Sequence, residues 1–252
     1  MASGEVLAIR QAPASVVLAT SLMDLVIMKH LPRTTLLCAA LLALVACSSN
    51  RVDPKDYSGF LKDYSRLKPA ESVSGVPVMR WVDPDIKASQ YTKVFIEPSQ
   101  FYPKPQPTNV ISAQTLQEIT RYFNEAMRRE LGSVLTLVKE PGPNTIVVRP
   151  AITAVSTSTE GLKPYEVIPI ALVAAAVNTA AGGRDQAVDI AVEAAFLDGG
   201  NQKVLAQVVR KGSGKDLEND TTQLTLNDVK PVLDGWASDM RRSFVAMRDK
   251  KR

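Results

Sequence analysis

A short apolar run that ends in a cysteine decides which residues of this chain can take part in the fold. The basic residues Lys29 and Arg33 precede an apolar stretch at 36–45, and a small residue, Ala46, stands where a signal peptidase would cut. At about 1.5 Å per residue, this stretch spans about 15 Å as a helix, roughly half the hydrocarbon thickness of a bilayer. The run is therefore typical of a cleaved secretory signal, and we exclude residues 1–46 from the fold.

The tetrapeptide at 44–47, LVAC, adds a second property to this signal. It resembles the lipobox of bacterial lipoproteins, in which an aliphatic residue stands three positions before a cysteine and a small residue stands directly before it. The resemblance implies cleavage between Ala46 and Cys47, a diacylglyceryl group on the Cys47 sulfur and a further acyl chain on the new amino terminus. Several buried acyl chains make a stable anchor. An ordinary signal with an incidental cysteine is the alternative.

The signal also suggests how the chain is divided. Residues 1–27 are interpreted as an over-extended start, because Met28 would begin a normal lipoprotein signal at 28–46. A lipidated tether is expected at 47–56 and a single periplasmic α+β domain at 57–252. Ser48, where an inner-membrane retention signal usually has Asp, resembles the outer-membrane default. We therefore expect an envelope location, on the outer membrane and facing the periplasm.

Cleavage at this position also removes residue types that many chemistries require. The single histidine, His30, and one of the two cysteines, Cys38, lie in the discarded segment, while Cys47 is assigned to the lipid. Ser-His-Asp and Cys-His catalysis, zinc sites of the usual composition and intrachain disulfides are then excluded, so no cofactor and no metal are expected. The formal charge of +4 falls only to about +3, which gives no strong field for nucleic acid.

Periodic patterns predict the elements of the domain. Strands are expected at 91–98, 135–139 and 145–157, and a hairpin is expected to join 186–197 to 204–210 through a glycine turn. Because 145–157 contains Pro150, that strand is expected at a sheet edge or a bulge. Apolar residues at helical spacing predict two amphipathic helices. One is capped at Ser112 or Thr115 and ends near Gly132, and the other covers 229–247 with Pro231 in or near its first turn.

The predicted fold class follows from the order of these elements, strand, helix, several strands and helix. An antiparallel sheet of about four to five strands, with both helices packed on one face, buries both apolar helix faces. Near the amino end, Phe60, Leu61, Tyr64 and Leu67 share a face at helical spacing. The segment 57–67 is therefore expected to form one or two helical turns that dock on the domain.

Three stretches carry a family resemblance. They are YSGFLKDYSRL from Tyr57, RWVDPD from Arg80 and YTKVFIEPSQFY from Tyr91. Together they resemble the bacterial lipoproteins of the domain of unknown function 3313 family. The resemblance covers the chain from Tyr57 to the last helix, and the family brings no established activity with it.

An uncharged apolar stretch at 167–181 is the main candidate for partner binding. It is too short to span a bilayer comfortably, so it is either a docking or membrane-dipping loop or a buried crossover helix. The residues singled out within it are Val167, Ile168, Ile170, Leu172 and Val173.

Three further groups are better explained by structure than by function. Basic residues cluster at 241–252, where positive charge also suits the carboxyl end of a helix. Asp83 and Asp85 are the carboxylates that could suggest glycosidase chemistry, yet their context is typical of a turn. The sequence GSGK at 212–215 lacks the spacing of a phosphate-binding loop and is expected to be a loop after the hairpin.

Three functional hypotheses remain from the sequence. The first is a non-enzymatic lipoprotein that binds or scaffolds an envelope protein or a peptidoglycan-associated partner. The second is an envelope hydrolase that uses carboxylates such as Asp83 and Asp85, and the third is a lipoprotein that self-assembles into an oligomer through 167–181. In each case the lipid bilayer is a partner through acylated Cys47.

Overall fold

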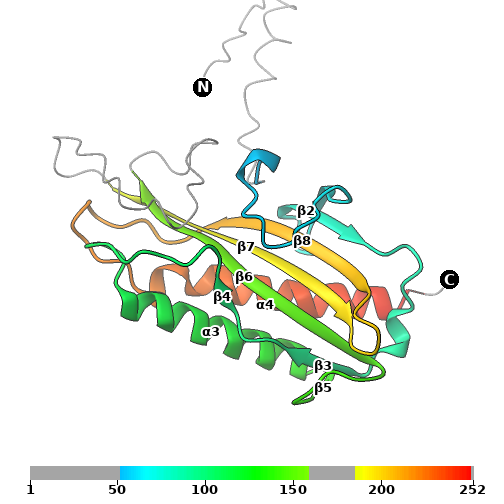
Figure 1. Ribbon diagram of the computed structural model, residues 1–252. Helices are drawn as coiled ribbons and strands as arrows, with labels where there is room; N and C mark the ends of the chain where they lie inside the picture. Colours follow the sequence, from blue (N-terminus) through cyan, green and yellow to red (C-terminus); the bar gives the residue numbers. More distant parts are fainter. Residues whose placement is uncertain (1–51, 159–184, 251–252) are drawn as a thin grey trace, which may run out of the picture. The chain divides into compact units, whose positions relative to one another are not determined.

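Two long helices lie along one face of a mixed β-sheet in the computed structural model, which describes residues 52–158 and 185–250 (Figure 1). The helices are α3 (Ala113–Gly132) and α4 (Leu226–Arg248). The strands are β1 (Lys68–Glu71), β2 (Pro77–Val82), β3 (Lys93–Ile96), β4 (Gln100–Phe101), β5 (Thr136–Leu137), β6 (Thr145–Ser158), β7 (Ala187–Asp198) and β8 (Val204–Ser213), with short 3-10 turns at Pro54–Asp56 and Ala88–Gln90. The α+β class and the two helices are thus as predicted. Neither helix of this described part has the length and apolar character that crossing a bilayer requires.

The sheet corrects the prediction of a purely antiparallel arrangement. Over the described residues it has eight strands in the order β1-β2-β8-β7-β6-β3-β5, and β4 also pairs with β6. The neighbouring pairs β1-β2, β2-β8, β8-β7 and β7-β6 are antiparallel. By contrast, β3 and β4 run parallel to β6, and β5 runs parallel to β3. The reason is the position of α3 between β4 and β5, because a helical crossover returns the chain in the same direction.

Three strands, β1, β2 and the two-residue β4, were not predicted. Trp81 and Val82, which directly precede the predicted turn at Asp83 and Asp85, end β2, and β2 pairs with β8 from Met79 opposite Val209 to Val82 opposite Ala206. The alternation of apolar and polar residues is weak in this stretch, which explains the error. β2 matters for the rest of the molecule because its helix-facing side chains form one wall of the cavity described below.

Helix α3 forms as its sequence predicts. The Ser112 hydroxyl caps the helix by accepting a hydrogen bond from the Thr115 N–H at 3.0 Å. The side chains of Leu116, Ile119, Phe123 and Met127 are buried against the sheet and α4. The Phe123 ring meets the Trp236 ring of α4 edge to face, with 6.2 Å between the ring centroids. The apolar faces of both helices therefore share one core.

Helix α4 begins three residues before the predicted start. Asp228 Oδ2 accepts hydrogen bonds from the Thr225 N–H at 2.8 Å and the Thr225 hydroxyl at 2.7 Å, which fixes the first turn. Pro231 therefore lies in the second turn, not in or near the first, and the helix gives up one backbone hydrogen bond there.

Pro150 is at neither an edge nor a bulge, contrary to prediction. It lies inside β6, between the last pair with β3, Ile96 opposite Val148, and the first pair with β4, Gln100 opposite Ala151. Proline has no N–H to donate, and Pro150 lies at the point where the strand beside β6 changes from β3 to β4. The register shift of β6 comes later, between Ile152 and Ala154.

The segment at 52–67 covers the sheet face opposite the helices, and it is not helical at 57–67 as predicted. Gly59 and Lys62 have φ angles of 89° and 63°, which interrupt a helix. The segment is held instead by Glu193 of β7, whose carboxylate accepts from the Ser58 N–H at 2.9 Å and from the Tyr64 hydroxyl at 2.6 Å. Leu61, Leu67 and neighbouring rings form a second apolar cluster with the sheet, so the predicted docking is present in a different conformation.

Alkaline pH tests this docking. Burial and the hydrogen bond to Glu193 raise the pKa of Tyr64 to about 12, and burial with the bond to Asp198 raises the pKa of Tyr91 to about 12. Both phenols ionise near pH 10 in an unfolded chain. Their contribution to stability is therefore complete below pH 10 and is lost as the pH rises through 12. An ultraviolet titration of phenolate should therefore show ionisation that continues to about pH 12.

Tyr64→Phe and Tyr91→Phe should each remove one late step from that titration. If ionisation of the tyrosines were complete near pH 10, the hydrogen bonds to Glu193 and Asp198 would not persist in solution.

Candidate functional site

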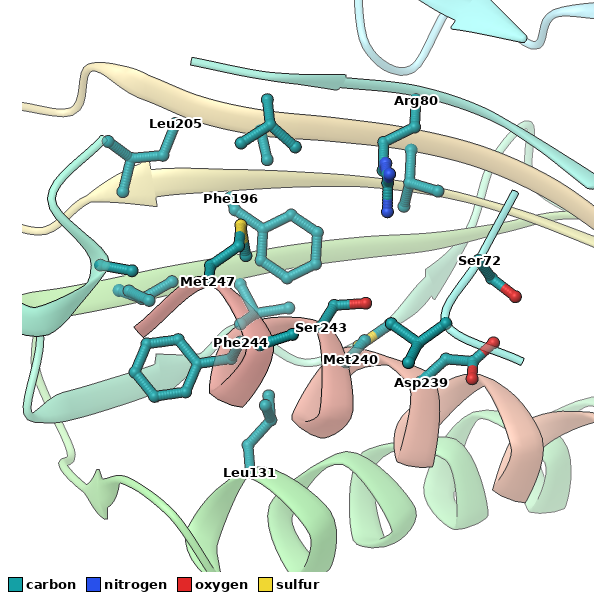
Figure 2. Close-up of a pocket in the computed structure, with 18 of the residues that line it drawn as sticks. Ser72, Arg80, Leu131, Phe196, Leu205, Asp239, Met240, Ser243, Phe244 and Met247 are labelled. Carbon is teal, nitrogen blue, oxygen red and sulfur yellow. The ribbon is translucent and has the colours of Figure 1, made fainter. Parts of the chain in front are cut away.

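A cavity of about 440 Å³ lies between the second half of α4 and the helix-facing side of the sheet (Figure 2). Its volume falls in the range of about 300–1,000 Å³ typical of small-molecule sites. Alternate residues of β2, Val78, Arg80 and Val82, line it, because successive side chains of a strand face opposite sides, and β8 contributes residues between Leu205 and Arg210. α4 supplies the other wall with Met240, Ser243, Phe244 and Met247.

Most of the cavity wall is apolar. Val82, Val192, Phe196 and Leu205 come from the strands, and Figure 2 shows Phe196 close to Met247 on the side where Leu205 and Phe244 also lie. The short side chains of Ala206, Ser243 and Ala246 also line the cavity and leave volume between larger neighbours unfilled. This side of the cavity therefore suits a hydrocarbon group.

Polar groups gather on the other side, where Figure 2 shows Ser72, Arg80 and Asp239. Arg210 and Asp239 form a buried ion pair there, with 3.0 Å between Nη2 and Oδ2 and side chains 7% and 6% exposed. The Ser74 hydroxyl donates to the same Oδ2 at 2.8 Å, so the turn between β1 and β2 is fastened to α4. The Arg210 guanidinium also lies 5.5 Å from the centre of the Trp236 ring.

The electrostatics of this pair are those of a desolvated salt bridge. Burial lowers the pKa of Arg210, and the hydrogen bond and charge of Asp239 act in the opposite direction. Arginine nevertheless stays charged in proteins. Arg210 Nε is buried and, within the described residues, has no hydrogen-bond partner. Among the described residues, Arg210 therefore brings a buried donor to the cavity lining that no protein acceptor satisfies.

Arg80 differs from Arg210 in having no ion-pair partner in the part of the chain that the structure describes. It stands on β2 opposite Val208 of β8, and its guanidinium points into the cavity (Figure 2). Lys250, just beyond α4, also lines the cavity. The walls thus carry three cationic side chains and one carboxylate, Asp239.

The residues singled out in the sequence do not form this cavity. The predicted lipid-attachment and cleavage positions, Cys47 and Ala46, lie outside the described residues, and the whole 167–181 segment does as well. Those predictions, including partner binding through Val167, Ile168, Ile170, Leu172 and Val173, stay predictions.

Asp83 and Asp85 have the structural role that their context indicates. Asp83 is buried, receives the Asp85 N–H at 3.0 Å and pairs with Lys203 Nζ at 2.6 Å. The Lys203 ammonium and this N–H hold the pKa of Asp83 below its usual range. A carboxyl group that is stabilised as the anion in this way is poorly suited to act as a general acid.

The remaining candidates are also accounted for locally. Arg241 of the basic cluster pairs with Glu130 of α3 at 2.9 Å, and Arg248 pairs with Asp249 at 2.8 Å. The GSGK sequence is not a loop throughout, because Gly212 and Ser213 extend β8. A Cβ atom on Gly212 would come within 2.5 Å of Val232, so this glycine lets α4 approach the strand closely.

The cavity itself was missed because its residues come from distant parts of the sequence. In the sequence, Arg80 stands out only as the start of RWVDPD, Arg210 lies at the end of a predicted strand, and Asp239 lies within a predicted helix. A signal was present in α4, whose apolar face carries an aspartate next to Met240. A charge at a core position requires a buried partner, and Arg210 in the middle of a strand is the matching anomaly. Within the described residues, no cluster of His, Cys, Asp and Glu could hold a metal ion.

Fold and cavity together define an α+β domain in which one mixed sheet and two helices enclose a mostly apolar pocket with a charged side. Comparison with known proteins identifies its lineage. Residues 56–240 match the family described as "Protein of unknown function (DUF3313)", and the chain belongs to that family. The resemblance noted in the sequence is thereby confirmed.

The names of two curated relatives describe them as lipoproteins. The chain is 40% identical over 199 residues to the "Uncharacterized lipoprotein YdcL" of Escherichia coli K12, covering 79% of this chain and 90% of the relative. The same identity and coverage hold for the YdcL protein of Escherichia coli O157:H7. These names agree with the lipobox, so a lipoprotein of unknown specific role is the coarse description that the comparisons support.

Solved structures give only distant matches. The PelC dodecamer from Paraburkholderia phytofirmans matches with a TM-score of 0.33 and 8% identity, over 64% of this chain and 96% of that chain. The hypothetical protein CT253 from Chlamydia trachomatis matches with a TM-score of 0.33 and 14% identity, over 62% and 93%.

Proposed function

We propose that the mature protein is a non-enzymatic binding module, anchored through acylated Cys47 to the outer membrane and facing the periplasm. The observation that carries the binding role is the cavity between α4 and the sheet, which is largely apolar and has Arg80 and the Arg210–Asp239 pair on one side. This combination of an apolar wall and a few placed polar groups is typical of ligand sites. The lipobox and the lipoprotein relatives support the anchor.

Photocrosslinking in cells tests this proposal. A photoreactive amino acid at Met240, which lines the cavity, should capture a discrete species from the envelope, whereas the same amino acid at Gln117, an exposed position of α3, should not. Mass spectrometry of the purified protein identifies the adduct and also reads the amino terminus, which should begin at acylated Cys47. Equal capture from both positions, or capture from neither, would contradict the binding role, and an unacylated Cys47 would contradict the anchor.

The hydrolase alternative lacks a supporting observation among the described residues. The carboxylate that lines the cavity, Asp239, is already paired with Arg210, and Asp83 is paired with Lys203. Glycoside hydrolysis needs one carboxyl group that can give up a proton and a second one across the scissile bond. Self-assembly through 167–181 stays a separate prediction, and deletion of that segment should abolish any oligomer that sedimentation detects.

A further inference from the structure

We infer that the cavity binds a single-chain amphiphile with an anionic head, and that Arg80 is the residue that recognises the head. This inference rests on the proposed binding role and specifies its ligand class. It combines three features of the described residues: the separation of apolar and charged walls, the excess of positive charge, and an arginine with no protein partner that points into the cavity.

The charge balance selects an anion. The Asp239 carboxylate pairs with Arg210 and accepts from the Ser74 hydroxyl, so its negative charge is already balanced within the protein. Arg80 lines the same side of the cavity and adds positive charge that no carboxylate of the cavity wall offsets, whereas Lys250 lines the cavity beyond Met247, at the other end. A guanidinium presents a planar fork of donors that matches a carboxylate or a phosphate in two-pronged fashion. The unsatisfied Arg210 Nε is a second donor on the same side.

The shape of the lining selects one hydrocarbon chain. From Arg80, the cavity continues past Met240 and Phe196 toward Leu205 and Met247, so the charged and apolar ends are separated (Figure 2). A volume of about 440 Å³ lies at the small end of ligand sites, which favours one chain over two. Met240 and Met247 add unbranched, adaptable side chains, which can fit flexible alkyl groups of different length.

Photolabelling of the intact mature lipoprotein in phosphatidylcholine vesicles tests this inference. Three probes carry the same diazirine at the end of the same alkyl chain: a fatty acid, a lysophosphatidic acid and a fatty alcohol. At least one anionic probe should label peptides that contain Phe196, Leu205 or Met247, and the alcohol should label them about tenfold less, as expected for loss of a charge-assisted hydrogen bond. The more efficient anionic probe shows whether the head is a carboxylate or a phosphate.

Variants then separate the head from the chain. Arg80→Gln should reduce anionic labelling to the level of the alcohol, Arg80→Lys should keep part of it, and Arg121→Gln on the exposed side of α3 should change nothing. Arg80 has no ion pair to lose, so its variants should remain folded. Met240→Trp fills the cavity and should reduce labelling by all probes.

The outcomes distinguish this inference from the proposed function. Equal labelling by alcohol and acids, or full anionic labelling of Arg80→Gln, overturns the anionic head while leaving an apolar binding site. Labelling that is absent with every probe, or unaffected by Met240→Trp, overturns the single-chain amphiphile itself. Capture of a different species by the photoreactive amino acid at position 240 would then leave the binding role standing.

Discussion

Asp239→Ala should lower the free energy of unfolding by about 3–5 kcal/mol, because it leaves the buried Arg210 guanidinium without its counterion. The effect should far exceed the loss of one neutral hydrogen bond. It also frees the Ser74 hydroxyl, so the turn between β1 and β2 loses its attachment to α4. Urea denaturation of the mature lipoprotein, followed by circular dichroism, measures the change.

Two further variants assign this loss to the unpaired charge. Ser74→Ala removes only the hydroxyl bond and should cost about 1 kcal/mol. The double variant Arg210→Met with Asp239→Leu replaces the pair by apolar groups of similar size and should recover most of the stability. A double variant as unstable as Asp239→Ala would show that the ion pair is not the source of the effect.

Phe123→Ala should cost about 3–5 kcal/mol, because the ring is fully buried where α3, α4 and the sheet meet. The substitution removes the edge-to-face contact with Trp236 and leaves a cavity that the surrounding helices fill only in part. The same denaturation experiment reports the loss, and the slope of the transition should stay unchanged if only stability is affected.

Phe123→Leu and Arg121→Ala are the matched controls for that result. Leucine keeps most of the buried volume and should cost clearly less than alanine, while Arg121 is exposed on the same helix and should change stability by less than about 0.5 kcal/mol. Similar losses from Phe123→Ala and Arg121→Ala would mean that α3 does not pack as described.

The elements with strong periodic patterns were the ones that the sequence predicted well. The apolar positions of α3, from Leu116 to Met127, are buried, and the hairpin of β7 and β8 has its turn at 198–203 as expected. Their patterns are local, so neighbouring residues suffice to define them. β2 was missed because its partner β8 lies more than 100 residues further along the chain, and β1 pairs in turn with β2. Strand direction was also wrong, since parallel pairing depends on where a crossover helix returns.

The site was less accessible to prediction than the fold. Arg80, Arg210 and Asp239 share a cavity, although they come from β2, β8 and α4. Single residues with no motif give no spacing to recognise, and an unfilled volume depends on how side chains pack in three dimensions. The segment that looked most functional in the sequence, 167–181, lies outside the described residues.

The attachment of 52–67 to Glu193 limits how far the domain can lie from the predicted lipid on Cys47. Only residues 48–51 separate the predicted lipid at Cys47 from Val52, which is buried against the sheet. At most about 3.6 Å per residue, five steps of chain extend less than about 20 Å. With a lipid on Cys47, such a tether would be too short for the domain to move far from the membrane that holds the lipid. A lipid on Cys47 would therefore keep the cavity close to one membrane, where amphiphiles concentrate.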